Sequence, residues 1–216
     1  MRAAARLVAL GLFLVGASSC AIYQGRSPIP GTHEGEWGTL RDLATRRALL
    51  YDGFDHRATA TATHLSRAVR EARAQRLASW KGWTEEELQR QLEFERAEAA
   101  KGEDFLLAFY TSDSRANDLD SVTSVWHIAV RAAGAETRVA DVDALDAKDP
   151  ETVMLFPWIG PFDTLYRVRF PPTLGVVFGE GGYALEFASA LGKLELDWDQ
   201  PALPTPLLLP APPERR

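Results

Sequence analysis

The chain of 216 residues contains one cysteine, Cys20. A chain with one cysteine cannot form a disulfide within itself, so its fold must rest on a hydrophobic core and not on covalent cross-links. Six tryptophans and ten phenylalanines supply large apolar side chains for such a core. The position of Cys20 is also informative, because it directly follows a short apolar segment near the start of the sequence.

The first 19 residues have the pattern of a secretory signal peptide. Arg2 and Arg6 supply positive charge, residues 7–15 form an apolar stretch, and small residues precede Cys20. A membrane-spanning helix needs about 20 apolar residues, and residues 7–17 provide roughly half of that. Plain secretion would leave Cys20 as an unpaired thiol in an oxidising compartment. The sequence therefore favours a dedicated role for this cysteine.

The segment Ala17-Ser18-Ser19-Cys20 resembles the lipobox of bacterial lipoproteins, with Ala17 where Leu is more usual. The resemblance implies that the Cys20 thiol receives a diacylglyceryl group, that residues 1–19 are removed, and that the new amine is acylated. Two or more acyl chains anchor a protein stably. Ala21, where Asp would favour the inner membrane of Gram-negative bacteria, favours the outer membrane. We therefore expect a domain in the periplasm or at the cell surface.

The charge of the processed chain restricts its partners. Removal of residues 1–19 takes away two bases and no acid, which leaves 22 bases, 30 acids and a net charge of about −8. A net acidic surface argues against nucleic acid or an anionic bilayer surface as a partner. We expect membrane contact through the lipid anchor, a protein partner in the envelope, and no cofactor.

Composition divides the processed chain into three parts. Glycines and prolines interrupt residues 20–38, which predicts a flexible tether. Residues 39–199 have the size of a single globular domain. Six prolines in residues 200–216 predict a disordered tail, although its run of three leucines, Leu207 to Leu209, is unusual for a spacer and is a candidate docking segment.

The first half of the domain combines strand and helix patterns. Residues 47–54 are a candidate strand, and residues 58–63 alternate Thr and Ala as an exposed strand does. Residues 65–79 have apolar side chains at helical spacing. Thr84 and Glu87 then form a capping box, and Gly102 follows the second helical pattern. The sequence therefore predicts a helical hairpin at about 64–101.

The second half of the domain has strand patterns separated by turn signals. Residues 193–198 alternate most clearly between charged and apolar side chains. The other candidate strands are 105–110, 125–130, 139–142, 164–170, 175–178 and 183–188. Short strands at this spacing predict a mainly β fold, an antiparallel β-sandwich with the helical hairpin inserted (α+β). The alternative is an α+β layer in which the hairpin packs across one open sheet.

Three sequence pieces carry a second resemblance: residues 109–113, Trp126 and residues 166–171. Together they resemble uncharacterised exported lipoproteins built on an immunoglobulin-like sandwich. The resemblance spans roughly half of the chain, lacks the paired cysteines of antibody domains, and implies no catalytic residues.

The polar loop after residue 111 is a candidate for chemistry. Asp113, Asp118 and Asp120 are weak candidates for a calcium site, since hard cations prefer several oxygens, but the same residues also suit turns. An enzyme site assembled from these carboxylates and His127, within residues 113–127, is the alternative function. No local catalytic or metal motif supports it, so we expect no metal and favour a non-enzymatic role.

The most unusual loop is residues 156–162, which has three aromatic residues between prolines and glycine. Phe156, Trp158 and Phe162, with Arg167 and Arg169 on the following strand, are the candidate binding surface. The alternative is that the loop covers one end of the core. These observations together favour a non-enzymatic binding or assembly module anchored in the cell envelope.

The lipoprotein interpretation makes a direct prediction about Cys20. Because only a thiol accepts the lipid, Cys20→Ser should abolish acylation and processing while leaving the folded domain unchanged. Labelling with radioactive palmitate, followed by membrane fractionation of wild type and variant, measures this. A variant that stays both labelled and membrane-bound would show that residues 7–17 act as a retained anchor instead.

Overall fold

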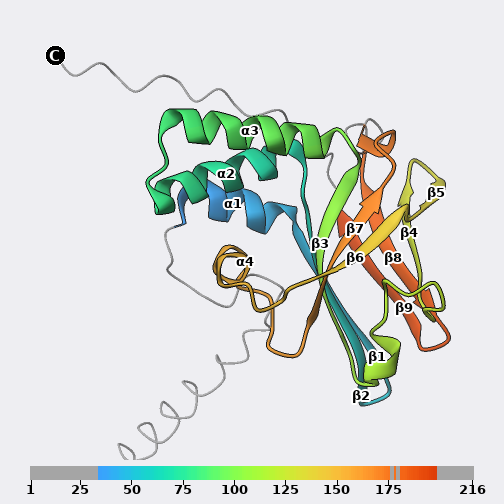
Figure 1. Cartoon of the computed structure of the whole chain (residues 1–216). Coiled ribbons are helices and arrows are strands. Elements are labelled where there is room, and N and C mark those ends of the chain that lie inside the picture. The colour runs from blue at the N-terminus through green and yellow to red at the C-terminus, as the bar shows by residue number, and fades with distance from the viewer. Residues whose placement is uncertain (1–33, 176–177, 179–180, 199–216) are drawn as a thin grey trace, which may run out of the picture.

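The computed structural model describes residues 34–175, 178 and 181–198 (Figure 1). These residues form a mainly β structure of two antiparallel sheets with several helices, an α+β arrangement as predicted. The larger sheet, sheet A, has five strands in the spatial order β1 (Thr45–Asp52), β2 (Asp55–His64), β3 (Glu103–Thr111), β7 (Thr164–Phe170) and β6 (Asp141–Leu145).

The smaller sheet, sheet B, packs against one face of sheet A through a shared apolar core. Strand β9 illustrates how the sequence produces this packing: Leu194, Leu196 and Trp198 are buried, and the residues between them point outward. Four strands make up sheet B, in the spatial order β5 (Ala135–Arg138), β4 (His127–Ala132), β8 (Tyr183–Ser189) and β9 (Gly192–Trp198).

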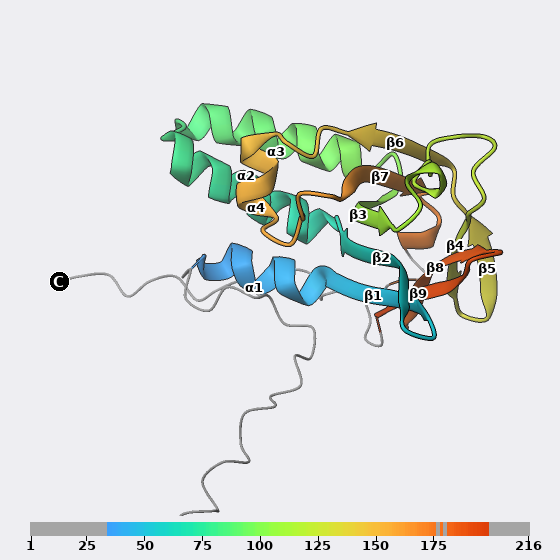
Figure 2. The ribbon, with the colours of Figure 1, turned by 90° about the horizontal axis from the view of Figure 1, so that it is seen from below.

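Helices cover the opposite face of sheet A, so the described residues form three layers (Figure 1). Viewed from below, the helices gather on one side of the molecule and sheet B lies on the other (Figure 2). The helices on this face are α1 (Gly35–Ala44), α2 (Arg67–Lys81), α3 (Glu85–Ala99) and α4 (Pro150–Leu155). A short 3-10 helix, η1 (Ser114–Ala116), follows β3.

The helical hairpin forms where the sequence predicted it. Ser66 caps α2 through the Val69 amide, and Gly82 ends α2 in the left-handed conformation that glycine favours. Thr84 and Glu87 form the predicted capping box of α3. The hairpin joins β2 to its neighbour β3 and packs on the outer face of sheet A. Features of both predicted architectures, the face-to-face sheets and the hairpin laid across a sheet, are therefore present.

Strand β2 corrects the prediction of an exposed strand at 58–63. Ala58, Ala60 and Ala62 are 0% exposed because they face the core between the sheets, where Ala60 lies opposite Phe109 of β3. Thr61 and Thr63 face the helices and are also buried. Small polar residues alternating with alanine resemble a solvated surface in sequence, but here both faces of the strand are covered.

Other predicted boundaries also differ from the structure. Helix α1 begins at Gly35, so the predicted tether is wrong at 35–38, where Trp37 is buried against Phe156. Residues 175 and 178 are helical, not part of a strand. Cys20, the signal segment, the remaining tether and the tail at 200–216 lie outside the described residues. Among the helices that the structure describes, none is long and apolar enough to cross a membrane.

Gly102 lies where the hairpin returns to sheet A, and it allows close contact with β7. A Cβ atom there would lie 2.9 Å from Arg169 Cγ and even closer to the Phe170 carbonyl oxygen. Because a backbone oxygen cannot move aside easily, we expect Gly102→Ala to lower the free energy of unfolding by about 1 to 3 kcal/mol. Urea denaturation measures the loss.

The matched control is Gly181→Ala, since a Cβ at Gly181 would meet no atom within 4 Å. Its effect should stay within about 0.5 kcal/mol. Equal effects of the two substitutions would contradict the close approach at Gly102.

Candidate functional site

The aromatic loop 156–162 is only partly available as a surface. Phe156 is 2% exposed, and its ring packs edge-on against Trp37 and Trp158 at centroid distances of 5.5 and 5.6 Å. Phe156 agrees with the alternative prediction that the loop covers the core, since it belongs to the core beneath the helices. Trp158 is half-buried, and Phe162 is 80% exposed.

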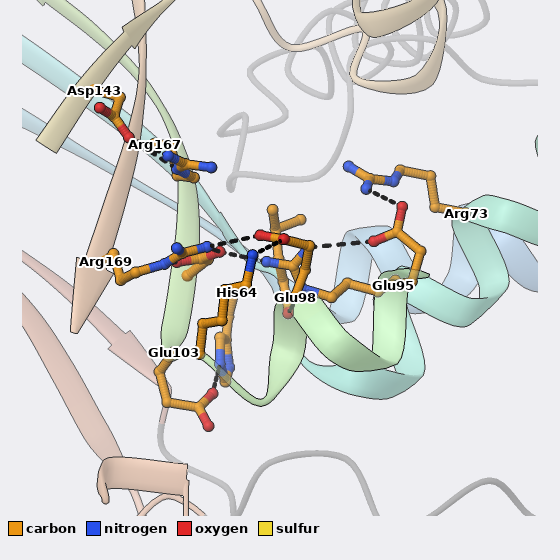
Figure 3. Close-up of polar contacts among 12 residues, drawn as sticks. His64, Arg73, Glu95, Glu98, Glu103, Asp143, Arg167 and Arg169 are labelled. Carbon is orange, nitrogen blue, oxygen red and sulfur yellow. Dashed lines mark hydrogen bonds and ion pairs between the residues drawn. The ribbon is translucent and has the colours of Figure 1, made fainter. Parts of the chain in front are cut away.

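Arg167 and Arg169 both point from β7 toward the helical layer, where acidic side chains of the chain itself bind them (Figure 3). Arg167 pairs with Asp143 of β6. Arg169 donates two hydrogen bonds of 2.7 Å to the Asp104 carboxylate. Hydrogen bonding to Asp104 raises the pKa of the Arg169 guanidinium further above its ordinary value. Both arginines are thus paired with acidic side chains of the chain itself.

The three candidate metal ligands differ in their contacts and in their exposure. Asp113 caps η1 and pairs with Arg115, whose hydrogen bond lowers the pKa of the Asp113 carboxyl. Asp118 is half-buried and Asp120 is exposed. His127 is hydrogen-bonded to Glu136 at 3.1 Å and not to any of these aspartates. In the described part of the chain, no group of three or more His, Cys, Asp or Glu side chains is arranged to hold a metal.

A buried ion cluster was not anticipated from the sequence. Asp104, on β3, is completely buried and accepts hydrogen bonds from Arg169 and from Arg70 of α2. Arg70 is also buried; it donates to Glu95 of α3 at 3.2 Å and to the Leu65 carbonyl oxygen at 3.0 Å. Each buried charge therefore has an opposite charge beside it, which is the condition for tolerating charges away from water.

The cluster extends along the hairpin toward solvent. Arg73 and Gln91 donate to the second oxygen of Glu95, at 2.7 and 3.1 Å. Glu98 accepts from Arg169 at 3.3 Å. Three arginines thus balance three carboxylates from two helices and two strands (Figure 3). One sequence signal was available, because Glu95 follows Leu92 on the apolar side of the helical pattern of α3.

A second buried polar group lies near this cluster. His64 of β2 hydrogen-bonds to the Tyr183 hydroxyl of β8 at 2.6 Å and to Glu103 at 2.9 Å. Burial raises the pKa of the Tyr183 hydroxyl. His64 and Tyr183 pack among Phe105 and Phe178. The group therefore links the two sheets.

A groove of about 440 Å³ lies beside the ion cluster, between the hairpin, α4 and sheet A. Its apolar side includes the buried residues Leu106, Leu155, Phe156 and Leu165. Phe156 thus takes part in the candidate site from the core side, as one of its walls. The other lining residues are Arg73, Leu77, Gln91, Phe94, Glu95, Leu145, Asp146, Asp149, Glu151 and Thr152.

The polar side of the groove is predominantly acidic. Glu151 pairs with Lys81, whereas Asp146 and Asp149 accept hydrogen bonds from Lys148 N–H and from Thr152. The hydrogen bond from the Thr152 hydroxyl lowers the pKa of the Asp149 carboxyl, so this carboxylate is ionised at neutral pH. The groove therefore offers an apolar surface beside negative charge, which suits a ligand with an apolar body and a cationic group.

The ion cluster forms one wall of this groove, since Arg73 and Glu95 belong to both. We expect Arg70→Met to lower the free energy of unfolding by about 3 to 5 kcal/mol, because it removes the only helical cation on Asp104 among the described contacts. Chemical denaturation followed by tryptophan fluorescence measures the change.

The comparison variant is Arg57→Met, which breaks an exposed pair with Asp52 and should cost no more than about 1 kcal/mol. If the two variants lose the same stability, the cluster does not hold the hairpin on the sheet.

The groove and the ion cluster are thus one continuous region, built by the hairpin and sheet A and walled in part by α4. Its geometry suits the binding of an extended ligand segment. Comparison of the chain with protein-family models, with curated proteins and with solved structures found no match.

Proposed function

We propose that this protein is a lipid-anchored lipoprotein of the cell envelope whose folded domain binds a partner protein without catalysis. The observation that carries the proposal is the groove, in which a buried apolar side faces the carboxylates of Asp146 and Asp149. Its partner is a peptide segment with leucine-like side chains and a nearby lysine or arginine. Apolar contact supplies affinity, and the acidic rim selects the charge.

The rigidity of the groove supports a binding role. Arg70 and Asp104 hold the hairpin against sheet A, and Arg41 of α1 donates a hydrogen bond to the Leu155 carbonyl oxygen of α4, so contacts within the chain support these groove walls. A preformed site loses little conformational entropy when it binds. Phe94 and Leu145 line the groove and are 55% and 39% exposed, so a partner can cover them on binding.

The location belongs to the same proposal. Lipid on Cys20 would hold the protein at the membrane, with the outer membrane favoured in a Gram-negative host. Fifteen residues lead from Cys20 to Gly35, where α1 begins, and they can span at most about 54 Å. The domain would then work close to the bilayer, in the periplasm or at the cell surface. Its acidic charge disfavours nucleic acid as a partner.

We propose further that the two sheets are related to the immunoglobulin-like sandwich. Support comes from their face-to-face packing and from Trp126, which is buried in the shared core. Such a fold implies no particular chemistry, so the proposed function rests on the groove and not on this relationship.

Photo-crosslinking in intact cells tests the groove as the binding site. A photoreactive benzoylphenylalanine replaces Phe94, which lines the groove, or Phe54, which is fully exposed in the turn between β1 and β2. We expect position 94 to capture one or a few reproducible envelope proteins that position 54 does not capture. Identical adducts at the two positions, or none at position 94, would contradict the proposal.

A further inference from the structure

We infer that, in the absence of a partner, the groove binds the C-terminal segment of the same chain, residues 207–216. This inference rests on the groove proposed above as the binding site and adds its regulation. The segment has the sequence Leu-Leu-Leu-Pro-Ala-Pro-Pro-Glu-Arg-Arg. Its ten residues combine an apolar run with two arginines, which match the apolar side and the acidic rim of the groove.

The apolar part of the segment fits the apolar side of the groove. Leu207 to Leu209 are three consecutive leucines, and the groove presents Leu106, Leu155, Phe156 and Leu165. Prolines before and after the leucines restrict the backbone to extended conformations. Less entropy is therefore lost when the segment is held along a groove.

The basic part of the segment fits the acidic rim. Arg215 and Arg216 follow the leucines by six and seven residues, and Asp146 and Asp149 lie on the rim with their hydrogen bonds made to groups of their own loop and helix. Guanidinium groups pair well with carboxylates, and such pairs gain strength where water is partly excluded. Charge complementarity thus favours this segment over an acidic one.

The segment can also reach the groove. Trp198, at the end of β9, donates a hydrogen bond of 3.1 Å to the carbonyl oxygen of Ala44 in α1. One turn earlier in α1, Arg41 donates a hydrogen bond of 3.1 Å to the carbonyl oxygen of Leu155, which lines the groove. Nine residues from Trp198 to Leu207 span about 30 Å when extended. This exceeds the path along the Trp198 side chain, one helical turn, the Arg41 side chain and the two hydrogen bonds.

Attachment to the same chain makes the segment an effective competitor. A short tether gives an attached ligand an effective concentration in the millimolar range. An external partner must displace it, so its apparent affinity for the groove falls by the fraction of chains in which the segment is bound. The groove is then inhibited by its own chain until a stronger ligand arrives.

Disulfide trapping tests the contact in the full chain. Cys20 is the only native cysteine, so Cys20→Ser provides a background in which every cysteine is an introduced one. Leu145→Cys combined with Leu208→Cys places one thiol on the groove and one on the segment. The control combines Phe54→Cys, at an exposed turn outside the groove, with Leu208→Cys.

We expect the 145–208 pair to form an intramolecular disulfide at least about tenfold faster than the 54–208 pair under mild oxidation, as its high local concentration requires. The rate should not depend on protein concentration. Charge reversal at Arg215 and Arg216 to Glu should slow it. Equal rates for the two pairs, or disulfides only between chains, would overturn the inference.

A binding experiment separates this inference from the proposed function. A fluorescent peptide of residues 203–216 should bind the full chain carrying Leu207→Asp, Leu208→Asp and Leu209→Asp at least about tenfold more tightly than it binds the unaltered chain. If both chains bind the peptide equally well while position 94 still captures specific proteins, binding of the tail in the groove is rejected and the groove remains a partner site. Tail binding without any capture at position 94 would reject the partner and keep the tail.

Discussion

The carboxylate of Asp104 is the point on which the helical layer and sheet A depend. It is completely buried on β3, and it accepts hydrogen bonds from Arg70 of α2 and Arg169 of β7. Burying a charge is costly unless an opposite charge and hydrogen bonds compensate it, so these three side chains have to come together as a unit. The hairpin is held in one position on the sheet as a result.

The position of the hairpin in turn determines the groove. Glu95 joins the buried cluster to Arg73, and both line the groove that α4 and sheet A complete. The same charges that fix the fold therefore set the width and the polarity of the candidate site. Ionised Asp149 adds negative charge at the opposite rim. A binding surface of this kind needs no moving part, because its walls belong to the framework of the domain.

Local patterns were the most predictable part of the fold. The capping box of Thr84 and Glu87 and the alternation that buries Leu194 and Leu196 are both present as predicted. The prediction of an exposed strand at 58–63 is wrong because alanine and threonine often line solvated surfaces, yet distant elements cover both faces of β2. The alternative for loop 156–162, that it covers the core, holds for Phe156, whose ring packs against Trp37. The residues next to a position in the sequence do not specify which distant element will pack against it.

The sequence by itself determined the helical hairpin, most strands and the mainly β class, because capping and alternation act between residues a few positions apart. Only the tertiary structure decided the ion cluster and the groove. Asp104 meets Arg70 across 34 residues and Arg169 across 65, and no local pattern specifies which distant charges will share one buried site. The sequence therefore places Arg169 on a candidate binding surface, whereas folding pairs it with the Asp104 carboxylate of its own chain.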